Sequence, residues 1–456
     1  MGFQFTRHQE SCDEWEPSFT RLHVSRDVPE HLRDGAPEIL WLPPHADISP
    51  PIECLKPAIT CTRIDDTRDR EVCLVSTDGY GRGHAHFPLG QTIDGILLEA
   101  YREQLQAPLA AKLPFNYSLV PNWVKNAGKV LTKSHMARKP DIDFPGGDPA
   151  FVVEWLSELA AWCGINTKQG RPFFDWPDEY KAALCVSHDV DTDWLFRHPD
   201  WIERMCDMEE EHGVTGVWFC VPYYCRSRTA EKGIQRLLDR GCEIACHGYN
   251  HDAKLTFLDG RARDARFREI EKFVHQWRIR GFRSEWLLRT PSYLEKLSEL
   301  FEYDSSVPNV SSCFTSRTRN GCATCHVYKT HNGMLELPLT VPQDVERDLE
   351  GSTYREFWSQ QVVRARRIVS KGGLVMLSLH PQGHQSANRD ALDAFGLCLK
   401  EVTKIKGLWV TRPDRICDWL KSTEQNVSRE TPLPDLARET NIPDSCTSPA
   451  CGGIFP

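Results

Sequence analysis

The chain has 456 residues, of which 40% are hydrophobic and 26% are charged, and its formal net charge is −9 at pH 7. This composition is typical of a globular protein that is long enough to hold more than one folding unit. Because there is no basic excess to neutralise phosphates, nucleic acid is not expected as a partner. No apolar stretch is long enough for a membrane span.

The N-terminal sequence and the cysteines bear on location. The opening MGFQFTRHQESCDEWEP lacks the basic start and apolar core of a secretory signal. The 18 cysteines are scattered, and Cys185, Cys220 and Cys246 lie inside apolar runs, where a reduced thiol acts as a small buried hydrophobic side chain. These features predict a cytoplasmic protein.

Residues 1–170 form an N-terminal region for which we expect mixed α/β structure and to which we assign no function. One amphipathic helix is predicted over 91–106, where apolar residues recur at helical spacing. A second is expected to begin at Asp148 and Pro149, a cap followed by proline in the first turn, and to continue through Leu159.

From 175 to 422, short apolar runs alternate with helical segments. Continuous apolar runs, typical of strands buried on both faces, occupy 183–187, 216–221, 242–247 and 373–380. Helices are expected at 201–213, 229–241, 262–277 and 354–373. Gly213, Gly241 and Gly372 stand where helix C-caps belong. This alternation predicts parallel strands with helices outside, in a barrel or an open sheet. The polar, proline-rich stretch 424–456 is expected to be a disordered tail.

Two carboxylates follow the first of these strands. Functional residues of parallel α/β folds gather at the carboxyl ends of strands. Asp189 and Asp191 are two apart, so in an extended chain they point to the same face. Burying both is costly unless a cation lies beside them. The alternative is a solvated acidic turn.

Histidines follow two other strands. His247 and His251 are four residues apart, a spacing that suits two imidazoles on one metal, although a surface pair is the alternative. With one carboxylate they complete a facial ligand set that leaves positions open for water and substrate. His380 follows the last strand and is either a structural residue or a general acid.

The order of these segments resembles that of the polysaccharide deacetylases, carbohydrate esterase family 4 with its NodB homology domain. SHDVD, HGYNH, YDSSV and LSLHP resemble the first, second, fourth and fifth motifs, and GFRSEWLLRTPSY offers either Arg283 or Arg289 for the third. The resemblance covers roughly residues 175–420. The family more often has adjacent aspartates in the first motif, whereas Val190 separates them here, as in a D-x-D branch.

This resemblance implies a NodB-type irregular (β/α) barrel with a divalent metal. The ion would be zinc, with Co²⁺, Mn²⁺, Fe²⁺ or Ni²⁺ as alternatives. Its ligands would be Asp191, His247 and His251.

The family also implies roles in proton transfer. Asp189 would be the general base, held ionised by Arg283 or Arg289. His380 would protonate the departing amine. Asp304 would orient and charge His380.

The implied function is removal of an N-acetyl or similar acyl group from an amino sugar of a polysaccharide or glycan intermediate. A cytoplasmic location favours an intermediate. One alternative is a hydrolase of a formamide or a purine-derived amide on the same fold, and another is a catalytically inactive glycan-binding domain. The sequence predicts no oligomeric state.

Three further segments are of interest. Cys322, Cys325 and His326 have the spacing of a haem attachment site. We expect instead a loop, with a local disulfide or a zinc knuckle as further alternatives. His84 and His86 form an HxH motif among glycines, where a loop is expected. Residues 335–344 resemble the stretch that lines the substrate groove in the family, although their leucines fit a core equally well.

Overall fold

The computed structural model describes residues 18–37, 39–42, 55–63, 71–78, 80–98, 109–112, 151–165, 174–310, 321–330 and 332–430. Contacts between Cα atoms divide the chain into two units, Met1–Cys417 and Asp418–Pro456. The first unit contains both β-sheets, and the boundaries predicted within it from the sequence stay predictions.

An antiparallel sheet lies in the N-terminal part of the first unit, in the strand order β2-β1-β3-β4-β5. Its strands are β1 (Ser18–Val24), β2 (Ile39–Leu42), β3 (Lys56–Arg63), β4 (Glu71–Thr77) and β5 (Gly83–Ala85). The helices of this part are α1 (Glu30–Gly35), α2 (Leu89–Leu98), α3 (Leu109–Lys112) and α5 (Val152–Trp162). The expected mixed α/β structure is therefore confirmed.

Both helices predicted in this part are present. Helix α2 begins at Leu89, two residues before the expected range 91–106, and overlaps it at 91–98, while 99–106 fall outside the described residues. Helix α5 buries Val153, Leu156 and Leu159 along one side, as the spacing predicts. The expected start at Asp148 and Pro149 also lies outside the described residues.

The second sheet follows the strand order β11-β12-β10-β9-β8-β7-β6-β13, and β14 also pairs with β6. All its pairings are parallel except β11 with β12. Its strands are β6 (Ala182–Val190), β7 (Val217–Cys220), β8 (Glu243–His247), β9 (Gly281–Arg283), β10 (Tyr303–Asp304), β11 (Tyr328–Lys329), β12 (Leu335–Glu336), β13 (Leu374–Leu379) and β14 (Leu408–Val410). The four strands predicted from continuous apolar runs are β6, β7, β8 and β13.

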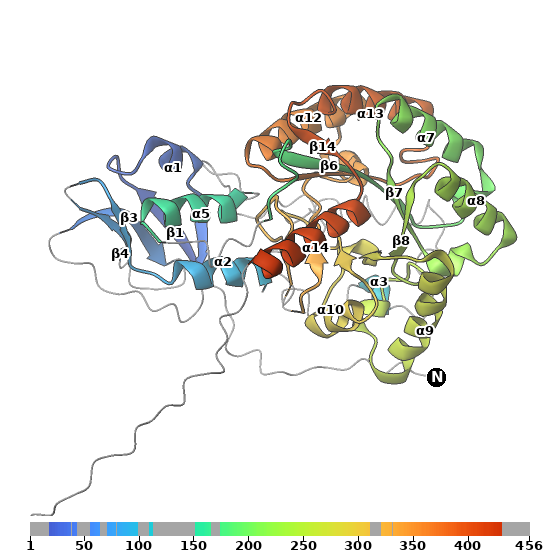
Figure 1. Ribbon diagram of the computed structural model, residues 1–456, viewed down its shortest axis with the longest axis horizontal. Coiled ribbons are helices and arrows are strands. Elements are labelled where there is room, and N and C mark those ends of the chain that lie inside the picture. The colour runs from blue at the N-terminus through green and yellow to red at the C-terminus, as the bar shows by residue number, and fades with distance from the viewer. Residues whose placement is uncertain are drawn as a thin grey trace, which may run out of the picture. The chain divides into compact units, whose positions relative to one another are not determined.

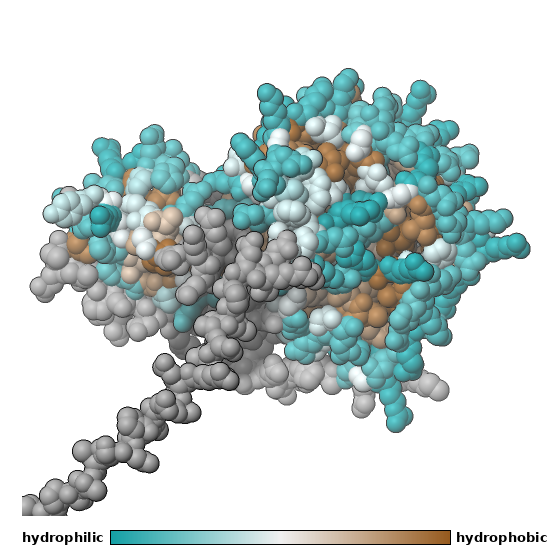
Figure 2. All heavy atoms as spheres, in the orientation of Figure 1, coloured by the Kyte–Doolittle hydropathy of each residue, from teal (hydrophilic) through white to brown (hydrophobic). Residues whose placement is uncertain are grey.

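Helices surround this sheet, and Figure 1 shows α7, α8, α9, α12 and α13 around the outside of its strands. Hydrophilic side chains cover much of their outer surface in Figure 2. The helices are α6 (Trp194–Arg197), α7 (Asp200–Glu211), α8 (Arg228–Asp239), α9 (Gly260–Trp277), α10 (Pro291–Ser298), α11 (Arg347–Glu350), α12 (Tyr354–Ser370), α13 (Arg389–Val402) and α14 (Pro413–Glu430). Parallel strands with helices outside confirm the predicted fold class.

The ends of three helices match their sequence signals. Gly213, Gly241 and Gly372 follow α7, α8 and α12, each with a positive φ of 69–79°. Residues other than glycine rarely adopt this conformation, so the glycines end the helices and allow the chain to turn into the next strand.

Strand β6 lies at the centre of the core. Every residue from Ala182 to Val190 is buried, and the strand is paired along both edges, with β13 on one side and β7 and β14 on the other. The strand therefore carries its two terminal carboxylates out of a rigid, closely packed element.

The C-terminal prediction needs a correction. Helix α14 continues to Glu430, so the first residues of the stretch expected as a tail are helical. In the first turns of this helix Ile416, Cys417 and Leu420 recur at helical spacing, and all three side chains are buried. Residues 431–456 lie outside the described residues. None of the described helices combines the length and the apolar character needed to cross a bilayer.

Candidate active site

Asp191, His247 and His251 converge at the carboxyl end of the second sheet. The Nε2 atoms of His247 and His251 lie 3.3 and 3.2 Å from Oδ1 of Asp191. Among the described residues this is one of two groups of potential metal ligands whose binding atoms all lie within 4.8 Å of one another. The structure therefore brings together the three side chains that the sequence analysis named as metal ligands.

The donor atoms of this cluster fit a divalent metal. Oδ1 of Asp191 is buried and accepts no hydrogen bond within the described part of the chain. The carbonyl oxygen of Arg283 can only accept, so the 3.0 Å contact with Nδ1 of His247 places the ring proton there and leaves the Nε2 lone pair for a metal. Two imidazoles and one carboxylate are a ligand set for zinc and neighbouring transition metals.

Charge also favours a cation at this point. Burial alone would raise the pKa of Asp191, but the neighbouring His251 and His380 hold it well below the usual range. The carboxylate is therefore ionised at neutral pH, as a metal ligand must be.

The loop after β8 that carries His251 is held by Glu285. Its backbone is left-handed at Gly248, His251 and Ala253, with φ of 60°, 55° and 60°. The carboxylate of Glu285 accepts four backbone N–H groups from this loop, at 2.7–3.1 Å, from Tyr249, Asn250, His251 and Ala253. These bonds offset the cost of the unusual backbone, so Glu285 positions a predicted metal ligand.

Asp189 is oriented on both of its oxygens. Nη1 of Arg283 donates to Oδ1 at 2.7 Å, and Nε2 of Gln343 donates to Oδ2 at 3.2 Å. Burial alone would raise the pKa of this carboxyl, but the charges of Arg283, His247 and His380 lower it below the ordinary value. Asp189 is therefore an ionised carboxylate, the state required of a general base.

The choice between the two arginines of the third motif is resolved by these contacts. Arg283 is fully buried, and its guanidinium also donates to Ser187, Ser305 and Ser378. Arg289 is equally buried, but its Nη1 donates to the carbonyl oxygens of Leu287 and Ser306. Arg283 is thus the arginine that contacts Asp189.

His380 also lies beside Asp189. Its Nε2 is 3.9 Å from Oδ2 of Asp189, while its Nδ1 lies 2.6 Å from Oδ1 of Asp344. Burial would lower the pKa of His380, but the charges of Asp344, Asp191 and Asp189 raise it to about 10. His380 is therefore protonated at neutral pH, the state required of a general acid.

The prediction for Asp304 was wrong. No hydrogen bond or ion pair within the described residues joins it to His380, whose partner is Asp344. The reason lies in the sheet order: Asp304 ends β10, which pairs with β9 and β12, whereas His380 follows β13 beyond β6. Asp304 accepts instead from Oγ of Ser306 at 2.6 Å and lies beside Glu336.

Three positioning residues were not identified from the sequence. Asp344 and Gln343 belong to the stretch 335–344, for which only a substrate groove or a core was considered. Glu285 lies between the two candidate arginines of the third motif. Gln343, Asp344 and Glu346 form a capped turn before α11, a pattern visible in the sequence but usually structural.

Two features near the site fit a substrate. A groove of about 100 Å³ is lined by Gln343 and by apolar side chains that include Leu287, Leu339 and Val341. Trp286 is 42% exposed, and its ring centroid lies 6.5 Å from that of His251. An exposed tryptophan next to a predicted metal ligand offers a flat apolar face to a bound molecule.

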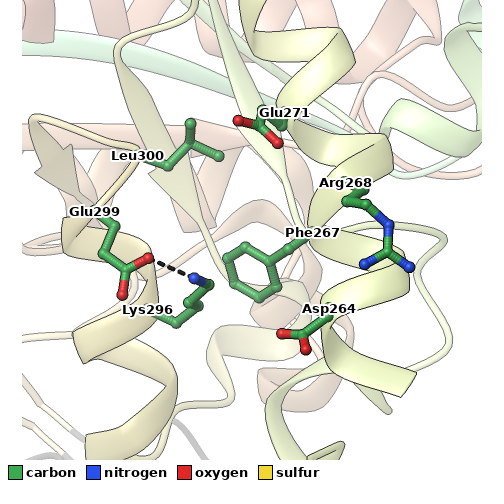
Figure 3. A pocket seen from close by; sticks show the side chains of 7 residues that line it. All are labelled: Asp264, Phe267, Arg268, Glu271, Lys296, Glu299 and Leu300. Atoms are coloured by element: carbon green, nitrogen blue, oxygen red, sulfur yellow. Dashed lines mark hydrogen bonds and ion pairs between the residues drawn. The ribbon is translucent and has the colours of Figure 1, made fainter. Parts of the chain in front are cut away.

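A second pocket, of about 280 Å³, lies between α9 and α10. Figure 3 shows Phe267 at its centre, with Lys296 and Glu299 paired on one side and Arg268 and Asp264 on the other. None of the predicted site residues lines it, so it is separate from the candidate active site.

Two further motifs from the sequence analysis are not among the candidate active-site residues. Cys322 and Cys325 are both free thiols, which rules out the local disulfide considered for them. His84 contacts Asp78 at 3.4 Å and His86 contacts Ser76 at 2.7 Å, all in or beside the N-terminal sheet. The HxH motif is therefore not part of the site.

No protein-family model and no curated protein matches the chain. Among solved structures, it is similar to a protein from Mycobacterium smegmatis assigned to the polysaccharide deacetylases, with 19% identity and a TM-score of 0.46 over 55% of this chain and 94% of the other. It is also similar to Puue allantoinase, with 14% identity and a TM-score of 0.46 over 57% and 96% of the two chains. A third is the peptidoglycan deacetylase PdaC from Bacillus subtilis, with 12% identity and a TM-score of 0.35 over 56% and 98%.

Proposed function

We propose that the chain is a metal-dependent amide hydrolase that removes an N-acetyl or similar acyl group from an amino sugar. One observation carries the proposal. Asp191, His247 and His251 form a group of potential metal ligands, and beside it lie an ionised base, Asp189, and a protonated acid, His380. Amide hydrolysis near neutral pH needs both a group that takes a proton and a group that gives one.

When bound, a divalent metal would supply Lewis-acid activation of a water molecule and of the amide carbonyl. Oδ2 of Asp189 takes the proton of the attacking water. Nε2 of His380 gives a proton to the departing nitrogen, so the C–N bond breaks to leave an amine and a carboxylic acid. Arg283 keeps Asp189 ionised, and Asp344 keeps His380 protonated.

The features that support a sugar substrate are the groove beside Gln343 and the exposed ring of Trp286. The apolar face of a pyranose stacks on an aromatic ring, while the hydroxyl groups at its edge remain hydrogen bonded. An acyl group projecting from that ring toward Asp191 would enter between the base and the acid.

The test is release of acetate by the full chain in the presence of added Zn²⁺ or Co²⁺. The substrates would be N-acetylglucosamine oligomers and nucleotide-linked N-acetylglucosamine, with chain lacking added metal as the control. Acetate that appears only with metal supports the proposal. Release of formate from N-formyl sugars, or hydrolysis of a purine-derived ring amide instead, would overturn the acetyl assignment. Metal-loaded chain that binds glycan but hydrolyses none of these compounds would overturn the enzymatic proposal.

A further inference from the structure

A second cluster of potential ligands lies where helix α5 meets the segment 321–330. The carboxylate of Glu154, the thiol of Cys325 and a ring nitrogen of His326 form the other group whose binding atoms all lie within 4.8 Å of one another. Oε1 of Glu154 is 3.3 Å from Sγ of Cys325 and 3.9 Å from Nε2 of His326. All of these residues are buried.

Among the described residues, Glu154 forms no ion pair with a lysine or an arginine, and its one ion-pair contact is with His326 of the cluster itself. Lys371 is nearby, but its Nζ pairs with Glu158 at 2.8 Å. Oε2 of Glu154 is buried without a hydrogen-bond partner in the described part of the chain. A thiol and a carboxyl in contact cannot both ionise there without a cation.

We propose that Glu154, Cys325 and His326 bind a zinc ion that joins helix α5 to the segment before β11. A thiolate, an imidazole and a carboxylate are all zinc ligands, and the charges of Zn²⁺, one thiolate and one carboxylate sum to zero. Binding releases the thiol proton and any proton on Glu154 to solvent. The proposal does not depend on the catalytic one.

The surroundings hold the ligands in place. Oε1 of Glu154 accepts from Oγ1 of Thr324 at 2.6 Å and from the backbone N–H of Cys325 at 2.8 Å. The carbonyl oxygen of Lys371 can only accept, so its 3.0 Å contact with Nε2 of His326 places the ring proton there and leaves the Nδ1 lone pair for a metal. A Cβ atom at Gly373 would lie 2.3 Å from Sγ of Cys325, so a glycine is needed for the thiol to fit.

The ligand chemistry gives a test that separates this site from the catalytic one. Only the Glu154 cluster contains a thiolate, so chain reconstituted with Co²⁺ alone should show a sulfur-to-cobalt charge-transfer band in the near ultraviolet. His247→Ala should keep that band. Cys325→Ser should abolish it, whereas Cys398→Ser, which changes a buried thiol outside both clusters, should keep it.

Metal analysis after reconstitution with Zn²⁺ gives a second readout. We expect about two zinc ions per wild-type chain and about one in Cys325→Ser or in His247→Ala. Glu154→Gln retains the acceptor for Thr324 but not the charge, so it should also lose the ion if a metal binds there. A cobalt protein without a thiolate band, or equal zinc content in wild type, Cys325→Ser and Glu154→Gln, would show that the cluster is only a buried hydrogen-bond network. If Cys325→Ser does not fold, Glu154→Gln and the wild-type spectrum still decide.

Discussion

Two pairs of buried or largely buried carboxyl groups in the same sheet have opposite pKa shifts. Asp189 and Asp191, at the end of β6, have pKa values below the ordinary range. Asp304 and Glu336, on β10 and β12, have raised pKa values, with burial as the largest cause in each. Burial acts in the same direction on all four groups, so the difference comes from their neighbours.

The neighbours differ in charge. The first pair faces a guanidinium and three imidazoles, which outweigh the cost of burial. The second pair has a cation, Arg289, beside it; Oγ of Ser306 and the backbone N–H of Val307 donate to it, and the two carboxyls lie beside each other, so burial outweighs these effects. The first arrangement keeps anions ready for a metal and a proton, whereas the second retains a proton and serves the packing of the sheet.

The largest effect is expected from Asp189→Asn. The amide is nearly isosteric but cannot take a proton, so kcat should fall about 10²–10⁴-fold, the range of general-base catalysis. Zinc content should remain that of wild type, because Asp189 is not a ligand in the proposed set. Acetate release and metal analysis on the same preparation check both. Asp304→Asn is the matched control from the other pair. Normal turnover by Asp189→Asn would falsify the base assignment.

A smaller loss is expected from Glu285→Gln. An amide retains one acceptor oxygen but presents an NH₂ group to backbone N–H donors, so the loop that carries His251 should loosen. We expect the affinity for Zn²⁺ to fall roughly 10–100-fold. Competition with a chelator measures this affinity. The control is Glu356→Gln, which changes an exposed carboxylate that also accepts a backbone N–H, at the start of α12. Equal affinities in the two variants would remove Glu285 from the metal site.

Asp344→Asn should change the pH dependence of kcat/KM more than it changes the value of kcat/KM at low pH. His380 acts when protonated, that is, below its pKa, which Asp344 helps to raise to about 10. Without that charge the pKa falls, so the alkaline limb of kcat/KM should move to lower pH. Asp304→Asn should leave the limb where it is, because Asp304 does not contact His380. The opposite outcome, a shift with Asp304→Asn alone, would restore the original assignment of the partner.

The smallest effect is expected from Glu336→Gln, on stability. A carboxyl whose pKa is raised in the folded state binds its proton more tightly there than in the unfolded chain. The free energy of unfolding therefore falls as pH rises from the ordinary glutamate pKa of 4.5 toward the folded pKa. Glutamine does not ionise, so the stability of the variant relative to wild type should rise between about pH 5 and pH 8. Urea unfolding at both values measures this gain, and a gap that does not change with pH would mean that Glu336 is ionised in the fold.

The metal-ligand cluster could be predicted because it depends on a general rule. Asp191, His247 and His251 follow separate strands, and the carboxyl ends of parallel strands meet at one edge. The choice of Arg283 required more, since it depends on β9 pairing with β8 so that His247 stands opposite Arg283. Without that register, the sequence does not show which of the two arginines in this short segment contacts Asp189.

The partner of His380 could not be predicted in the same way. Asp344 lies in a 3₁₀ turn, Asp344–Glu346, that follows no strand directly, so no periodicity brings it to β13. The expectation for Asp304 comes from the resemblance of YDSSV to the fourth family motif, and not from a rule of strand geometry. Likewise, Glu154 and Cys325 are brought together by tertiary contacts between distant segments, which spacing in the sequence does not report.

The contacts of Arg283 have a consequence for how the site responds to motion. Its side chain holds the proposed base, and its own carbonyl oxygen holds His247. A displacement of β9 therefore carries the proton acceptor and the metal ligand together, and their separation stays nearly constant while the sheet fluctuates. We therefore expect substitutions that shift β9 to alter the access of substrate before they alter the internal geometry of the proposed base and metal ligand.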